Sequence, residues 1–280
     1  MASEISVGTR LVALNRSTAA LNKVDSEIEK GTSAEVPRFV SEWRPITGGV
    51  DVQKDRIEGS FVAWGPGEEA WLIDHVIIPG DTARPEPWAE LAQVFGEFRP
   101  RAVAVDSGFN TSAVYEFVTR YRFCTAIKGN AGMGRPLVED ARKRAQRLRR
   151  RKGVHVEPIG VDGGKITIHS RLRQITPGPG YIHFPDDAAF DEEYFDQLAA
   201  EKLITRYRHG RPSREWQQIR PRNEALDCLV YALAALHLSG LRLDQPVAVP
   251  SQPAALSANQ QCKNFVAAWN ARSRHVIRRL

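Results

Sequence analysis

The stretch Ile46-Thr47-Gly48-Gly49-Val50-Asp51-Val52-Gln53 decides how the rest of this chain is interpreted. Val50 and Val52 alternate with Asp51, which predicts a strand with apolar side chains on one face and the carboxylate on the other. The two glycines allow another backbone or a substrate to approach the strand closely. Because Asp is a poor strand residue, Asp51 is either a functional carboxylate or an acid bonded to a neighbouring amide at a strand end.

Two further strand patterns follow, at residues 56–64 and 70–78, and short turns separate them. With the first strand they predict a three-stranded antiparallel meander. Helical spacing at 87–98 and 112–121 then alternates with short apolar strands at 101–106 and 125–128. A strand–helix–strand crossover makes neighbouring strands parallel. The sequence therefore predicts an α/β fold with a mixed sheet, a meander followed by parallel strands, and helices on both faces.

The later part of the chain predicts an accessory layer over residues 153–222. Its elements are strands at 154–156 and 181–184, helices at 165–174 and 191–200, and a hairpin formed by 203–208 and 215–219. A helix over 223–238 is apolar around almost its whole circumference, which indicates burial. Residues 1–45 predict a helix at 10–29 and a linker, 46–240 the main domain, and 241–280 a linker with a basic tail.

Composition excludes several classes of protein. The 280 residues are 42% apolar and 26% charged, a balance typical of soluble globular proteins. No apolar run is long enough to span a bilayer, and the start of the chain does not resemble a signal peptide, so we expect a cytoplasmic protein without a membrane partner. Three widely spaced cysteines, Cys124, Cys228 and Cys262, fit neither a disulfide framework nor a zinc site.

A basic segment indicates a polyanionic partner. The net charge is +6, and residues 141–152 contain eight of the basic side chains: Arg142, Lys143, Arg144, Arg147, Arg149, Arg150, Arg151 and Lys152. Such a run can be the solvated face of a helix, but contact with phosphates is the preferred interpretation. No aromatic residues are interleaved with it, so stacking on bases is not indicated.

Three isolated acids stand out against their surroundings. Asp51 lies in the first strand, Asp106 ends a later strand, and Asp227 lies in the first turn of the buried helix. A first-turn acid is also favoured by the helix dipole, which is the structural alternative for Asp227. Carboxylates brought together need cations, and hard oxygen ligands select Mg²⁺ or Mn²⁺. Two such ions, about 4 Å apart, can hydrolyse a phosphodiester. This order of acids matches the ribonuclease H-like layout of nucleases and integrases.

The chain resembles the nuclease half of the large terminase subunits of lambda-type tailed phages. The resemblance covers roughly residues 36–239 and is carried most specifically by Thr47-Gly48-Gly49-Val50-Asp51-Val52-Gln53 and by Arg222-Asn223-Glu224-Ala225-Leu226-Asp227-Cys228-Leu229-Val230-Tyr231-Ala232. It implies an endonuclease that cuts concatemeric double-stranded DNA during packaging in the bacterial host cytoplasm. It also implies three partners: an ATPase domain, a small terminase subunit and the portal.

Site roles follow from the resemblance by position. Asp51, Asp106 and Asp227 would be the catalytic, metal-binding triad, with Asp51 bridging two Mg²⁺ or Mn²⁺ ions. Glu224 would support the triad, and Lys128 with the basic run would hold the DNA backbone. No Gly-x-x-x-x-Gly-Lys-Ser/Thr motif occurs, so ATP hydrolysis is not expected. The chain is then either an isolated nuclease domain or a shortened prophage gene. The alternatives are a resolvase-like or integrase-like nuclease of the same fold, and a non-catalytic DNA-binding scaffold.

Overall fold

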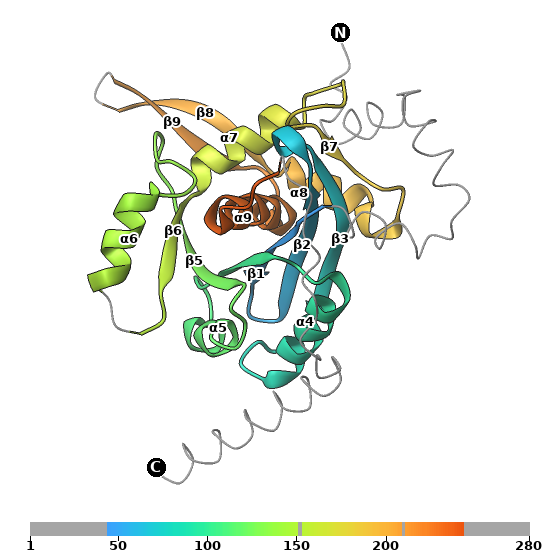
Figure 1. Ribbon diagram of the computed structural model, residues 1–280. Helices are drawn as coiled ribbons and strands as arrows, with labels where there is room; N and C mark the ends of the chain where they lie inside the picture. Colours follow the sequence, from blue (N-terminus) through green and yellow to red (C-terminus); the bar gives the residue numbers. More distant parts are fainter. Residues whose placement is uncertain (1–43, 151–152, 209–210, 244–280) are drawn as a thin grey trace.

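One mixed sheet organises the part of the chain that the structure describes, which comprises residues 44–150, 153–208 and 211–243. In this computed structural model seven strands lie in the order β6-β5-β4-β1-β2-β3-β7 (Figure 1). The helix predicted at 10–29 lies outside the described residues, as do residues 244–280 of the predicted linker and basic tail.

The predicted meander and the parallel strands after it are confirmed. The strands β1 (Ile46–Val52), β2 (Arg56–Trp64) and β3 (Ala70–Pro79) pair antiparallel, with the short turn η1 (Pro66–Glu68) before β3. The strands β4 (Ala102–Asp106) and β5 (Cys124–Asn130) continue the sheet parallel to β1. The helices α4 (Pro85–Phe98) and α5 (Thr111–Val118) return the chain between these strands, which is why they run parallel. This is the mixed sheet, an antiparallel meander followed by parallel strands, that the sequence predicts.

The prediction of a separate layer over residues 153–222 was wrong for its strands. β6 (Val156–Gly160) extends the main sheet beside β5, and β7 (Ile182–His183) pairs with β3 at the opposite edge. The strand was misplaced because Glu157 and Pro158 are both uncommon in strands. Proline is tolerated here because β6 is an edge strand. The basic helix α6 (Ala141–Arg150) connects β5 to β6.

Helices cover both faces of the sheet. On one face α4 and α5 bury aromatic side chains such as Trp88, Phe95 and Phe117. On the other lie α7 (Val161–Arg171), the turn η2 (Ala188–Phe190), α8 (Glu192–Leu198) and α9 (Glu224–Ser239). The helix α7 begins four residues earlier than predicted and includes Gly163 and Gly164, which are weak helix formers. A Cβ at Gly164 would lie 2.6 Å from Val230, so glycine permits the close packing of α7 on α9.

The helix α9 lies directly against β1. A Cβ on Gly49 would lie 2.0 Å from the carbonyl oxygen of Cys228, so only glycine fits at this contact. Thr47 Oγ1 donates a hydrogen bond of 2.7 Å to the carbonyl oxygen of Ala232, one turn further along α9. The helix ends at Gly240, which is in the left-handed conformation (φ 64°). These contacts fix the first turn of α9 over the middle of the sheet.

A two-stranded hairpin stands apart from the main sheet. It consists of β8 (Glu201–Arg208) and β9 (Arg211–Gln218), which pair antiparallel over their whole length. Both strands are longer than predicted. Figure 1 shows the hairpin extending away from the body of the protein, beyond α7.

Candidate active site

Asp51 and Asp106 stand on neighbouring strands at the same level of the sheet. Val50 pairs with Val105 in the parallel β1–β4 ladder, so the residues that follow them occupy adjacent positions on one face. Glu58 lies opposite Asp51 on the other side, in the antiparallel β1–β2 ladder. Asp227 approaches from the first turn of α9, which packs on this face of β1 and β4. The fold therefore brings the three predicted acids to one end of the sheet.

Asp51 is buried, and its pKa is strongly perturbed. Its side chain is buried, and the residue is only 6% exposed. Burial raises the pKa of Asp51 to about 7, against a hydrogen bond of 2.5 Å from Gln53 Nε2 that lowers it. Repulsion from Asp227 and Asp106 raises this pKa further. A carboxylate in this position is stabilised by any cation that enters the site.

Asp106 is oriented by backbone amides. The N–H of Gly108 donates to Asp106 Oδ2 over 3.0 Å. Burial raises the pKa of Asp106, whereas the N–H groups of Gly108 and Ser107 and the positive charge of Lys128 oppose that rise. Lys128 is exposed near the end of β5 and close enough to Asp106 to act on it electrostatically. Among the predicted DNA-binding residues whose side chains the structure describes, Lys128 is the one that acts electrostatically on Asp106.

Asp227 contacts a buried lysine that sequence reasoning did not identify. Lys165 Nζ, from α7, lies 3.0 Å from Asp227 Oδ1 and 2.6 Å from Glu201 Oε1. Asn223 Nδ2 donates to the same two acids, over 3.0 Å to Asp227 and 2.6 Å to Glu201. Asn223 occupies the N-cap position of α9, but its side chain forms these bonds rather than a capping bond. No spacing in the sequence relates Lys165 to residues 201 and 227.

Glu224 belongs to a separate ionic network beside Asp51. Arg56 pairs with Glu224 and also donates from Nε to Glu58 Oε1 over 2.5 Å. Arg222 joins the same two acids, over 2.6 Å to Glu58 and 3.4 Å to Glu224. Two arginines thus neutralise two glutamates at the edge of the acidic group. The supporting role expected for Glu224 remains a prediction.

The chemistry of the acids suits a hard divalent cation, although their present geometry does not form a ligand cage. No group of three or more His, Cys, Asp or Glu side chains in residues 44–150, 153–208 and 211–243 is arranged to hold a metal ion. Instead, the ammonium of Lys165 pairs with a carboxylate oxygen of Asp227, and the side-chain amide of Gln53 donates a hydrogen bond to one of Asp51. All donors are carboxylate oxygens, and burial raises the pKa of all three acids. Oxygen donors of this kind select Mg²⁺ or Mn²⁺.

The basic helix α6 lies far from these acids. Arg144 and Arg147 both pair with the buried Glu157, and Arg144 also donates to the carbonyl oxygen of Leu238 over 3.0 Å. Leu238 is at the far end of α9, about 16 Å from Asp227 along the helix axis. Arg142, Lys143 and Arg149 are exposed. The side chain of Arg150, and Arg151 and Lys152, lie outside what the structure describes.

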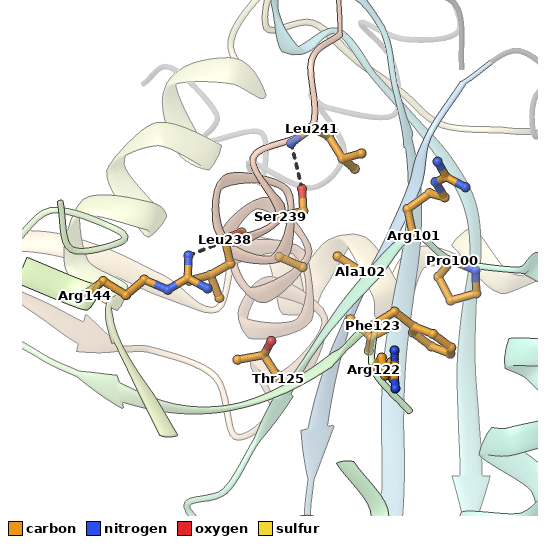
Figure 2. A pocket seen from close by; sticks show the side chains of 12 residues that line it. Pro100, Arg101, Ala102, Arg122, Phe123, Thr125, Arg144, Leu238, Ser239 and Leu241 are labelled. Carbon is orange, nitrogen blue, oxygen red and sulfur yellow. Dashed lines mark hydrogen bonds between the residues drawn. The ribbon is translucent and has the colours of Figure 1, made fainter. Parts of the chain in front are cut away.

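A cleft of about 550 Å³ lies at the same far end of α9. Figure 2 shows its lining, with Arg144 reaching Leu238 and with Arg101 and Arg122 on the opposite wall. Because it is formed by the beginnings of β4 and β5 and by the end of α9, the cleft is separate from the three acids.

Among the described residues, no helix is long and apolar enough to cross a membrane.

Comparisons with known proteins give a consistent relationship. The family described as "Terminase large subunit gpA, endonuclease domain" matches residues 15–247. The terminase large subunit of Escherichia phage lambda is 33% identical over 234 residues, which are 78% of this chain and 35% of that protein. The corresponding subunit of Enterobacteria phage P21 is 31% identical over 225 residues, 73% of this chain and 34% of that protein. The chain thus spans about a third of the length of these curated relatives.

Solved structures show more distant likenesses. The nuclease domain of the large terminase subunit gp2 of bacterial virus Sf6 is 13% identical, with a TM-score of 0.45 over 74% of this chain and 94% of that one. RuvC of Thermus thermophilus is 16% identical, with a TM-score of 0.33 over 69% of this chain and 95% of that one.

Proposed function

Because this chain belongs to the family of endonuclease domains of the terminase large subunit gpA, we propose that it hydrolyses phosphodiester bonds of double-stranded DNA with the help of divalent metal ions. In this proposal the substrate is concatemeric phage DNA, and the products carry 5′-phosphate and 3′-hydroxyl ends.

The convergence of three acids from three elements is the observation that supports this proposal. Asp51 and Asp106 are adjacent through the β1–β4 register, and Asp227 is placed beside them by the packing of α9 on β1. Burial disfavours the ionised form of each acid and so raises its pKa. A bound cation would stabilise that ionised form. A protein that only bound DNA would not need buried carboxylates here, since they repel phosphate.

Asp51, Asp106 and Asp227 would hold the metal ions, Mg²⁺ or Mn²⁺, with two ions expected. When bound, such ions lower the pKa of a water molecule and stabilise the charge on the leaving oxygen. The contact of 3.0 Å with Lys165 holds the carboxylate of Asp227 in place and opposes the rise in its pKa, and the hydrogen bond from Gln53 does the same for Asp51. Lys128 adds positive charge beside Asp106, where a backbone phosphate would approach.

Cleavage of a supercoiled plasmid in Mg²⁺, Mn²⁺ or EDTA tests the proposal. The variants are Asp51→Ala and, as a matched control, Asp186→Ala, which removes an exposed aspartate away from the three acids. We expect the wild type and the control to cut in either metal and not in EDTA, and Asp51→Ala to be inactive. An inactive wild type that still binds DNA would contradict the proposal and support a non-catalytic scaffold.

The partners belong to the same proposal. The relatives are whole terminase large subunits, of which this chain spans about a third. We infer that the nuclease acts together with a terminase ATPase domain, a small terminase subunit and a portal. Cleavage by the isolated chain should therefore show little sequence preference, since other subunits would select the cutting site.

A further inference from the structure

We propose that the β8–β9 hairpin, rather than the basic helix α6, is the arm that holds the DNA backbone beside the active site. This inference rests on the proposed function, because it specifies how the same substrate is bound. It assigns a role to the exposed cations of the hairpin and changes the role predicted for residues 141–152.

The base of the hairpin is attached to the acidic site. Glu201, the first residue of β8, lies 2.6 Å from Lys165, whose ammonium also contacts Asp227. Trp216 of β9 packs against His169 of α7, with ring centroids 4.9 Å apart and planes tilted by 30°, and its Nε1 donates to the carbonyl oxygen of Asp162. The hairpin therefore begins at the acids and is held there by α7.

The hairpin carries exposed positive charge from its base outward. Lys202, Arg211 and Arg214 are exposed, and none of them forms an ion pair with another described residue. Arg206, also on the hairpin, pairs with Glu215. Tyr207 adds a large aromatic side chain that is 74% exposed. Unpaired cations with an exposed ring are typical of a surface that contacts nucleic acid.

The pairing register places this charge on both faces of the ribbon. Lys202 pairs with Gln217, and Arg208 pairs with Arg211. Paired residues point to the same face, and so do residues separated by an even number along one strand. Lys202 and Arg211 therefore share one face. Arg214 pairs with Thr205 and therefore shares the other face with Tyr207. A two-stranded ribbon fits the major groove of DNA, where phosphates lie on both sides. Charge on both faces is what that position requires.

The helix α6 also has exposed cations, but it lies away from the acids and two of its arginines are paired. Arg144 and Arg147 already neutralise Glu157, so they are not free to bind phosphate without leaving a buried acid unpaired. Arg144 also contacts Leu238, at the end of α9 opposite to Asp227. Figure 1 shows α6 beside β6, whereas the hairpin extends past α7. DNA held by the hairpin lies beside the acids, and DNA held by α6 does not.

Two matched triple variants separate the two surfaces. The first is Lys202→Ala/Arg211→Ala/Arg214→Ala on the hairpin, and the second is Arg142→Ala/Lys143→Ala/Arg149→Ala on α6. Each removes three exposed cations, so the loss of net charge is the same. The measurement is the affinity for a short fluorescent DNA duplex, by anisotropy in Ca²⁺ or EDTA over a range of salt concentrations. Thermal unfolding verifies that both variants are folded.

We expect the hairpin variant to bind at least about tenfold more weakly and its slope of log affinity against log salt to fall by between about one and three. The α6 variant should bind nearly as well as the wild type. Equal losses in both variants would overturn the proposal, because net charge would then explain them. A larger loss in the α6 variant, or no binding by the wild type, would overturn it as well.

This assay does not depend on cleavage, so the two proposals can fail separately. If the wild type does not cut DNA but the hairpin variant alone loses binding, the proposed nuclease function fails and the hairpin assignment stands. If plasmid cleavage is confirmed and the hairpin variant binds normally, only the hairpin assignment fails. Asp51→Ala should bind the duplex at least as well as the wild type in either case.

Discussion

The ammonium nitrogen of Lys165 lies 3.0 Å from the carboxylate oxygen Oδ1 of Asp227. The same ammonium lies 2.6 Å from Glu201, so one buried cation balances two acids from two other elements. Burial lowers the pKa of Lys165, but the charges of Asp227 and Glu201 outweigh this effect and raise it above its ordinary value. Lys165 is therefore positively charged, and it contacts the same carboxylate, that of Asp227, which a metal ion would bind.

Replacing Lys165 with Met should destabilise the protein by about 3–5 kcal/mol in EDTA, because two buried acids lose their counter-charge. Mn²⁺ should restore more stability to this variant than it adds to the wild type, since a cation can take the place of the ammonium. The measurement is thermal unfolding with Mn²⁺ or EDTA. Lys202→Met, at an exposed position, is the control. Equal stabilisation of Lys165→Met and wild type by Mn²⁺ would contradict this explanation.

Asp51→Asn should abolish cleavage and yet stabilise the metal-free fold above neutral pH. The folded pKa of Asp51 is about 7, whereas its unfolded pKa is near the ordinary value of 3.8. The folded state therefore binds the extra proton, and stability falls as the pH rises between these values. The variant should be more stable by roughly 2–4 kcal/mol at about pH 8, with little difference at about pH 4. Denaturant unfolding in EDTA measures this gap, and a gap independent of pH would refute the explanation.

Gly49→Ala should cost about 3 kcal/mol or more of unfolding free energy, because the new Cβ would overlap the backbone of α9. The added methyl group would displace α9 and with it Asp227, so DNA cleavage should also fall. Gly59→Ala is the matched control in β2, since its Cβ would lie 3.5 Å from Val50, an ordinary contact. Chemical denaturation compares the two. Similar stabilities would show that α9 can move away from β1 at little cost.

Glu68→Gln should remove stability that depends on pH. A hydrogen bond with His237, and a second from Arg171, hold the pKa of Glu68 to about 2 although burial opposes this. A lowered carboxyl pKa stabilises the fold above the unfolded value near 4.5, and this contribution is lost as the pH falls toward 2. The variant should be less stable by roughly 1–3 kcal/mol at neutral pH.

Thermal unfolding of Glu68→Gln and the wild type, at several pH values from neutral down to about 2, measures this difference in stability. The difference from the wild type should shrink as the solution is acidified, because the wild-type acid becomes protonated too. Glu90→Gln, on the exposed surface of α4, should show no such trend. A constant difference across the range would mean that the contacts of Glu68 with Arg171 and His237 do not depend on its charge.

Local periodicity was sufficient to predict much of the fold. Alternation around Asp51 predicted β1, and the apolar circumference of residues 223–238 predicted α9. β6 was misplaced because an edge strand tolerates Glu157 and Pro158, which local propensity argues against. Local patterns therefore predicted a segment correctly where its buried face is the face on which its apolar residues recur.

The candidate site was only partly accessible to sequence reasoning. The three acids could be singled out because each interrupts an apolar segment, and the fold brings them to one end of the sheet. Lys165 and Glu201 could not be singled out, because their contact joins α7 to the start of β8 and depends on how these elements pack. For the same reason the density of positive charge in residues 141–152 did not reveal that Arg144 faces inward.

The sequence by itself determined the meander, the parallel strands and the buried helix of this protein, because side-chain period and burial are properties of short segments. Only the tertiary structure decided which charges are paired and which are free. Arg147 is neutralised by Glu157, whereas Lys202 remains exposed on the hairpin. The energy of an ion pair depends on a distance between atoms, and for residues far apart in the chain that distance exists only after the elements have packed.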